Sequence, residues 1–184
     1  GVTRMIIGLS GYAQTGKDTI AEHLVEHYGF TRIAFADPIR QALYALDPII
    51  PDYPAIPGIR LSWLLDRSNW EEVKRESPEI RRMLQRLGTE VARNQWGDDF
   101  WVDLAMAKAN RLDNVIITDV RFPNEYDAIV KAGGKVWRVE KPGVSAVNAH
   151  ASETALDGHT FDHTIVNMGS KDDLYAAVDY FIQH

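Results

Sequence analysis

Residues 5–20 read MIIGLSGYAQTGKDTI, and this stretch decides the fold. Residues 5–9 form an apolar run of strand length, which Ser10 and Gly11 end. After Gly16, apolar residues recur at helical spacing as far as Tyr28, and a glycine follows as a helix stop. The stretch therefore predicts a strand, a glycine-rich loop and a helix in direct succession.

The loop matches a phosphate-binding pattern, because Gly11 and Gly16 are separated by four residues and Lys17 follows. In such loops backbone N–H groups turn towards phosphate oxygens, and the positive end of the next helix faces them. The lysine then reaches the β- and γ-phosphates. The alternative is a glycine turn with a solvated lysine, and the strand before the loop and the helix after it argue against this.

Two aspartates are candidate ligands for Mg²⁺. Asp18 stands where a serine or threonine usually supplies a hydroxyl to the metal, and a carboxylate is also a hard oxygen ligand. Alternatively, Asp18 is a first-turn acid favoured by the helix dipole, with the Thr19 hydroxyl bound to a phosphate, and both interpretations stay open. Asp119 closes the apolar run 115–118, from which a second acid conventionally reaches the metal. An aspartate there is otherwise a helix cap.

Strands and helices alternate along the rest of the chain. We expect further strands at 33–36, 115–118, 136–139 and 164–167, and helices from residue 37 and at 61–75, 79–95, 99–112, 124–131 and 171–182. Residues 47–58 hold four of the eight prolines and are interpreted as an irregular excursion. The alternation predicts an α/β fold, a three-layer αβα domain around a parallel sheet of about five strands.

Composition excludes several classes of protein. The 184 residues are 45% hydrophobic and 25% charged, which is typical of one globular domain, and the absence of cysteine removes disulfides and thiolate sites. No apolar run approaches the ~18 residues of a membrane span, and no signal peptide pattern opens the chain. We therefore expect a cytoplasmic protein that binds no membrane. The net charge of −6 argues against nucleic acid as a partner.

An arginine-rich stretch interrupts this acidic chain. Residues 60–93 contain eight basic and six acidic residues, a local surplus of +2, and seven of the eight bases are arginine. Arginine binds phosphate through two parallel hydrogen bonds, so the stretch predicts contact with a second phosphate-bearing ligand. For any single arginine, a solvated helix face with ion pairs is the simpler interpretation.

Four segments together carry a family resemblance. They are the loop ending in residues 16–19 (GKDT), residues 35–40 (FADPIR), residues 84–90 (LQRLGTE) with Arg93 and Trp101, and residues 119–125 (DVRFPNE). A fifth and weaker match is residues 150–153 (HASE). In this order they resemble the bacteriophage deoxynucleoside monophosphate kinases, a branch of the P-loop nucleoside monophosphate kinases.

The resemblance implies transfer of the ATP γ-phosphoryl group to a deoxynucleoside or ribonucleoside monophosphate, with Mg²⁺ as cofactor. It implies a single kinase domain with its core at about 1–46 and 113–184, a helical acceptor-binding insertion at about 47–112 and a lid at about 139–152. Small nucleotides would be the partners, a homodimer stays open, and a phage-encoded chain would work in the host cytoplasm.

The resemblance also assigns residues to roles. The catalytic residues would be Lys17, Asp18 and Arg121, and the metal ligands Asp18 and Asp119. ATP would contact Gly11, Gln14, Thr15, Gly16, Lys17, Asp18 and Thr19. The acceptor would contact Asp37, Arg40, Trp70, Arg82, Gln85, Arg93, Arg121 and Glu125, and Arg138 and Lys141 would supply the charge of the lid.

Three alternatives remain. A P-loop kinase for another phosphorylated acceptor, such as phosphomevalonate or dephospho-coenzyme A, would share the loop and the fold. A nucleotide-switch regulator would ordinarily carry an Asn-Lys-x-Asp guanine reader, which the sequence lacks. A nucleic-acid-stimulated ATPase would need a basic face, which the net charge disfavours.

Overall fold

A computed structural model describes residues 4–145 and 154–184. The chain divides into two units, one formed by Gly1–Phe35 with Val102–His184 and the other by Ala36–Trp101. The end of the expected lid and the match at residues 150–153 lie outside the described residues. The helix from residue 37 was expected in the core and falls in the second unit, whereas most of the helix expected at 99–112 falls in the first.

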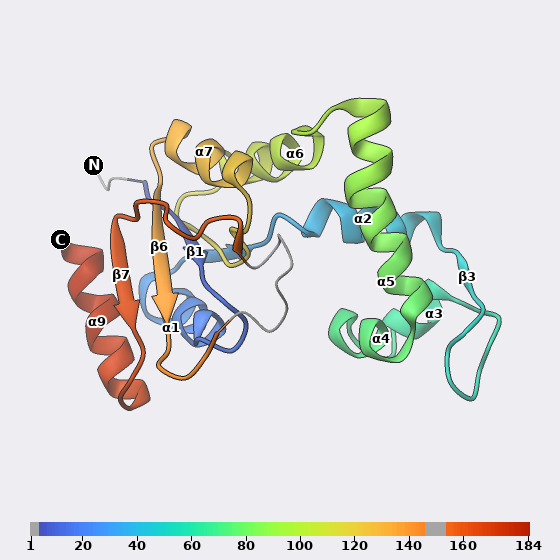
Figure 1. The fold of residues 1–184 in the computed structure, drawn as a ribbon, viewed down its shortest axis with the longest axis horizontal. Helices are drawn as coiled ribbons and strands as arrows, with labels where there is room; N and C mark the ends of the chain where they lie inside the picture. Colours follow the sequence, from blue (N-terminus) through green and yellow to red (C-terminus); the bar gives the residue numbers. More distant parts are fainter. Residues whose placement is uncertain (1–3, 146–153) are drawn as a thin grey trace. The chain divides into compact units, whose positions relative to one another are not determined.

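The first unit is built on a five-stranded parallel sheet, which confirms the predicted fold class (Figure 1). Its strands, in the order β2-β5-β1-β6-β7, are β1 (Ile6–Ser10), β2 (Thr31–Ile33), β5 (Val115–Ile117), β6 (Lys135–Glu140) and β7 (His163–Val166). β1 lies at the centre, with Ser10 beside Arg138 of β6. Since all five strands are parallel, the residues that follow them gather at one edge of the sheet.

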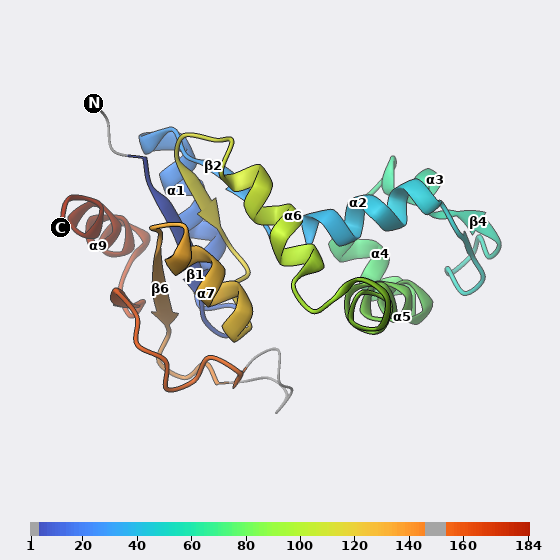
Figure 2. The same cartoon turned by 90° about the horizontal axis from the view of Figure 1, so that it is seen from above.

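Helices cover both faces of this sheet (Figure 2). α1 (Lys17–Tyr28) and α9 (Lys171–Gln183) pack on the face that carries Ile7 and Leu9. α6 (Phe100–Ala109) and α7 (Pro123–Lys131) pack on the opposite face, which carries Ile6. Alternate residues of each strand thus enter opposite layers, and strands with two buried faces read as continuous apolar runs in the sequence.

The second unit is mainly helical, with its own core. Its elements are α2 (Asp37–Leu46), β3 (Ile49–Ile50), β4 (Ile59–Arg60), α3 (Leu61–Leu65), α4 (Trp70–Glu76), α5 (Pro78–Gln85) and the π-helix η1 (Arg86–Trp96). The helix predicted at 61–75 is two helices, because the Asn69 side chain accepts a hydrogen bond from the Glu72 N–H and starts α4 anew. Within the proline-rich stretch 47–58, β3 forms an antiparallel pair with β4, which follows the stretch directly.

No helix within the described parts of the chain combines the length and the apolar character that a membrane crossing requires.

Candidate active site

The phosphate loop follows β1 and has a backbone that glycine makes accessible. Gly11 has φ 154° and Gly16 has φ 109°. A Cβ atom at Gly11 would lie 2.4 Å from the backbone carbonyl oxygen of Val139, and one at Gly16 would lie 2.7 Å from the side-chain amide nitrogen of Asn167. Gly11 is therefore required by space as well as by conformation, because the obstacle is backbone, whereas Gly16 is required chiefly by its positive φ.

Hydrogen bonds within the first unit fix this loop. The Thr15 hydroxyl donates to the Tyr12 carbonyl at 3.0 Å, and the Asn167 side-chain amide donates to the Thr15 carbonyl at 3.0 Å. The Lys17 ammonium donates to the Gly11 carbonyl. The loop is held in shape by its own residues and by the residue that follows β7, a form of preorganisation that favours anion binding.

Lys17 lies at the first position of α1 and is the electrostatic centre of the site. Its pKa is lowered from 10.5 to about 8, first by burial and then by the positive charges of Arg121 and Arg138, while Asp18 and Asp119 oppose the shift. The structure therefore brings Lys17, Asp18, Asp119 and Arg121 into one electrostatic neighbourhood, and their roles towards phosphates stay predictions.

The two candidate metal ligands differ in surroundings. Asp119 Oδ1 accepts a hydrogen bond of 2.7 Å from the Phe35 N–H. Asp18 is 78% exposed, and its carboxylate pairs with Arg32 of β2, a residue that sequence reasoning missed. Among the described residues no group of three or more His, Cys, Asp or Glu side chains could hold a metal ion. Two carboxylates are nevertheless a sufficient protein contribution for Mg²⁺ when substrate phosphates and water complete its shell.

Glu125 fixes the backbone at the start of α7. Its Oε1 atom accepts hydrogen bonds of 2.9 Å from the N–H groups of Arg121 and Phe122. Burial raises its pKa from 4.5 to about 7, the nearby Asp119 adds to the rise, and the two backbone bonds oppose it. Glu125 therefore orients the backbone that carries Arg121, while its contact with an acceptor stays a prediction.

A cavity of about 410 Å³ opens beside the phosphate loop. Its lining includes Gln14, Gly16, Lys17, Asp18, Thr19, Lys141, Asn167, Gly169, Lys171 and Leu174. The predicted loop residues thus meet Asn167 and Lys171, which sequence reasoning missed. Their position just after the last strand of a parallel sheet was the available signal, since ligands of such sheets bind at the carboxyl ends of the strands.

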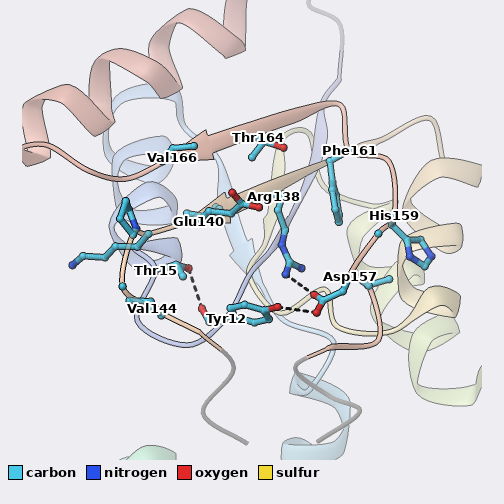
Figure 3. Close-up of a pocket in the computed structure, with 16 residues that line it drawn as sticks. Tyr12, Thr15, Arg138, Glu140, Val144, Asp157, His159, Phe161, Thr164 and Val166 are labelled. Carbon is cyan, nitrogen blue, oxygen red and sulfur yellow. Dashed lines mark hydrogen bonds and ion pairs between the residues drawn. The ribbon is translucent and has the colours of Figure 1, made fainter. Parts of the chain in front are cut away.

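Arg138, expected to supply charge to the lid, belongs to a strand rather than to the loop after it, and its role towards a lid stays a prediction. Arg138 lies inside β6, is 7% exposed, and donates to the Ser10 hydroxyl at 2.9 Å. It also donates to the Asp157 carboxylate at 2.9 Å (Figure 3). The guanidinium is therefore buried and paired on an inner strand, although it also lines a cavity together with the loop that follows β6. Lys141 does follow β6, and it lines both the cavity beside the phosphate loop and a second one of about 610 Å³.

The second unit has a cavity of about 470 Å³ of its own. It is lined by Asp37, Arg40, Gln41, Tyr44, Leu65, Asp66, Ser68, Asn69 and Trp70. The Arg40 guanidinium lies 6.0 Å from the centre of the Trp70 ring and 3.5 Å from a Glu71 carboxylate oxygen. Three predicted acceptor residues, Asp37, Arg40 and Trp70, therefore share one cavity.

The other predicted acceptor residues of this unit are not among those that line the cavity. Arg82 pairs with Glu79 at 2.7 Å, and Arg93 pairs with Asp98 at 3.2 Å. Gln85 is the last residue of α5. Contacts of these three side chains with a substrate stay predictions.

Comparison with known proteins identifies the family. Residues 65–178 match the family described as deoxynucleotide monophosphate kinase. The deoxynucleotide monophosphate kinase of Enterobacteria phage T4 is 24% identical over 94% of this chain and 96% of its own length. A protein of Acanthamoeba polyphaga mimivirus, provisionally named for the same activity, is 27% identical over 95% and 94%.

A solved structure supports the fold. The dephospho-CoA kinase of Campylobacter jejuni covers 97% of this chain and 95% of its own, with a TM-score of 0.53 and 16% sequence identity. At this identity the similarity concerns the fold alone. Since the family match spans more than half of the sequence, and the chain carries the phosphate loop with its partly buried lysine, this protein is a kinase that belongs to the deoxynucleotide monophosphate kinase family.

Proposed function

We propose that this protein transfers the γ-phosphoryl group of ATP to a deoxynucleoside monophosphate, forming ADP and the deoxynucleoside diphosphate. The observation that carries the proposal is Lys17, which lies partly buried at the start of α1, directly after a glycine loop, and is surrounded by the charges of Arg121, Asp18 and Asp119. The family of the chain supports the choice of a nucleotide as acceptor.

The phosphate loop is the donor site in this proposal. The backbone N–H groups of residues 11–19 and the Lys17 ammonium would bind the phosphates of ATP. The cavity that continues from the loop to Asn167 and Lys171 would take the nucleoside, and its volume of about 410 Å³ lies in the range of small-molecule sites. Lys171 would add a positive charge beside the donor.

The cavity of the second unit is the acceptor site in this proposal. Trp70 and Tyr44 supply aromatic faces, and Asp66, Asn69 and Gln41 supply hydrogen-bonding groups. A nucleobase combines a flat π-face with polar edges, so this lining has the chemistry to bind one.

The reaction needs no general base. The acceptor phosphate has a second pKa of about 6, so its attacking oxygen is already ionised near neutral pH. That oxygen forms a bond to the γ-phosphorus as the bond from the γ-phosphorus to the β–γ bridging oxygen of ATP breaks, and ADP leaves with the electron pair. Lys17 and Arg121 stabilise the negative charge on the phosphate oxygens during this step.

Asp119 and Asp18 would hold Mg²⁺, since both carboxylates lie close enough to Lys17 to raise its pKa. When bound, the metal would neutralise charge on the phosphates and orient them.

The decisive experiment measures ADP formation from ATP with each of the eight common ribo- and deoxyribonucleoside monophosphates. We expect phosphorylation of at least one deoxynucleoside monophosphate, with the diphosphate identified by chromatography. Dephospho-coenzyme A and phosphomevalonate in the same assay test the rival kinase activities. Turnover with none of the eight nucleotides would refute the proposed function.

A further inference from the structure

Arg138 is a buried positive charge that the proposed reaction does not use. One terminal nitrogen donates to Ser10 at the end of β1. The other donates to Asp157, and the guanidinium lies 5.0 Å from the ring centre of Tyr12 and 5.6 Å from that of Phe161 (Figure 3). Because an unpaired buried charge is strongly destabilising, Asp157 is held in place by the charge that it neutralises.

Asp157 joins this buried charge to the phosphate loop. While its Oδ1 atom accepts from Arg138, its Oδ2 atom accepts a hydrogen bond of 2.7 Å from the Tyr12 hydroxyl. Figure 3 shows the Asp157 carboxylate between the Arg138 and Tyr12 side chains. The same bond keeps the proton on Tyr12, whose pKa is raised mainly by the hydrogen bond to Asp157. The side chain that follows Gly11 is thus anchored to β6.

The anchor sits where the phosphate loop needs support. The loop leaves β1 through Gly11, and the Tyr12 carbonyl then accepts the Thr15 hydroxyl, which closes the first turn. Asn167 holds the second half of the loop through the Thr15 carbonyl. Among the described residues, the Tyr12–Asp157 hydrogen bond is what connects the first half of the loop to a distant part of the chain.

We propose that Tyr12 and Asp157 are positioning residues of the phosphate loop. Asp157, fixed by Arg138, holds the Tyr12 hydroxyl and thereby keeps residues 11–15 in the conformation that binds the phosphates of ATP. Neither side chain needs to touch a substrate for this role. The inference rests on the proposed function in one respect, namely that the loop binds ATP.

The test compares two tyrosines that make the same kind of bond. Tyr12→Phe keeps the ring beside Arg138 and removes only the hydroxyl. Tyr28→Phe is the matched control, because the Tyr28 hydroxyl donates to Asp179 at 2.7 Å and Tyr28 ends α1, away from the loop at its start. ATP affinity is measured by calorimetry without acceptor, KM values for ATP and acceptor by steady-state kinetics, and stability by thermal unfolding.

We expect Tyr12→Phe to weaken ATP binding about threefold to tenfold, as the loss of one hydrogen bond to a carboxylate allows. The KM for ATP should rise in parallel while that for the acceptor stays unchanged. Tyr28→Phe should leave the Kd of ATP unchanged, even where both variants lose similar thermal stability. Equal ATP affinities of the two variants would overturn the inference, and so would a change confined to the acceptor KM.

A second variant tests the coupling. Asp157→Asn removes the charge that fixes the network, and the double variant with Tyr12→Phe should bind ATP no more weakly than Asp157→Asn alone, because both substitutions break one connection. Additive losses would contradict the inference. Should Asp157→Asn fail to fold, Tyr12→Phe decides alone.

The two proposals fail differently. A wild-type protein that binds ATP but phosphorylates no nucleoside monophosphate refutes the proposed function and leaves this inference standing. An active kinase whose Tyr12→Phe variant binds ATP normally refutes only this inference, and a protein that does not bind ATP refutes both.

Discussion

Lys17 is partly buried at a position where the negative charge of a bound phosphate can offset the desolvation cost of its ammonium group. Its lowered pKa shows that the site without ligand disfavours the charged form, so an anion that enters gains the full benefit of a poorly solvated cation. Lys17→Ala should therefore lower kcat by about 10²–10³-fold or more. The measurement is ADP release at saturating ATP and acceptor, with Lys108→Ala on the exposed face of α6 as a control that keeps activity.

Asp37 differs from Lys17 because it lines the cavity of the second unit. Asp37→Asn should raise the KM for the acceptor and change kcat little, since the phosphate loop is untouched. Steady-state kinetics with each substrate varied in turn separates the two parameters. If Asp37→Asn and Lys17→Ala lowered kcat and raised the acceptor KM to the same extent, the division into a donor and an acceptor site would be wrong.

The titration of Glu125 should make the free energy of unfolding depend on pH. Because its pKa in the folded protein is about 7 against an ordinary value of 4.5, the folded state binds more protons than the unfolded state between these values. The free energy of unfolding should therefore fall as the pH rises from about 4.5 to about 7. Glu125→Gln keeps an oxygen acceptor for the Arg121 and Phe122 N–H groups and removes the titration.

Urea unfolding at several pH values between 5 and 8 measures this effect. Relative to wild type, Glu125→Gln should gain stability as the pH increases, and Asp127→Asn on the exposed side of α7 is the matched control. Plots of unfolding free energy against pH that run parallel for wild type and Glu125→Gln would argue against a raised pKa of Glu125.

At the scale of elements, β1 and α7 approach closely because Gly8 has no side chain. A Cβ atom at this position would lie 2.6 Å from Ile129 Cδ1 and 2.7 Å from Val120 Cγ2. Gly8→Ala should therefore destabilise the first unit by about 1–3 kcal/mol, the usual cost of overpacking a core.

Ile129→Val removes the methyl group that the new Cβ would meet. The double variant Gly8→Ala/Ile129→Val should lose less free energy of unfolding than the sum of the two single variants, as measured by chemical denaturation. Strict additivity would show that Ile129 is not the obstacle.

The phosphate loop and the alternation of strands and helices could be predicted because both depend on residues close together in the sequence. The interruption after α3, the β3–β4 pair and the π-helix η1 were missed, since a cap such as Asn69 and a change of helical type leave the apolar period almost intact. The contacts of Arg138 could not be predicted for another reason. Its partners Ser10 and Asp157 are far away in the sequence, and only the folded sheet brings them together.

At the scale of the whole molecule, the charge distribution favours binding of a small phosphate ligand over binding of a nucleic acid. The net charge is −6, and five of the eight basic residues in the arginine-rich stretch 60–93 form ion pairs. These pairs are Lys74–Glu71, Arg75–Glu76, Arg82–Glu79, Arg86–Glu90 and Arg93–Asp98. Contact between an arginine of this stretch and a substrate phosphate stays a prediction, since each of these pairs is exposed enough to exchange its partner.

Such a surface should not support binding to DNA. A protein that binds the phosphate backbone of DNA releases about one counterion for each phosphate it neutralises. The free energy gained by this release requires clustered lysine and arginine side chains that are not already paired with carboxylates. We therefore expect neither single- nor double-stranded DNA to stimulate ATP hydrolysis or to retain the protein at about 50 mM salt, where electrostatic binding is strong. Fluorescence anisotropy with labelled oligonucleotides and an ADP-release assay with and without DNA provide the measurements.

ATP hydrolysis that rises with DNA while no nucleoside monophosphate is phosphorylated would favour a nucleic-acid-stimulated ATPase. The arginines of 60–93 would then have to leave their carboxylate partners for the phosphates of the DNA backbone, and the response to DNA would weaken steeply as salt is added.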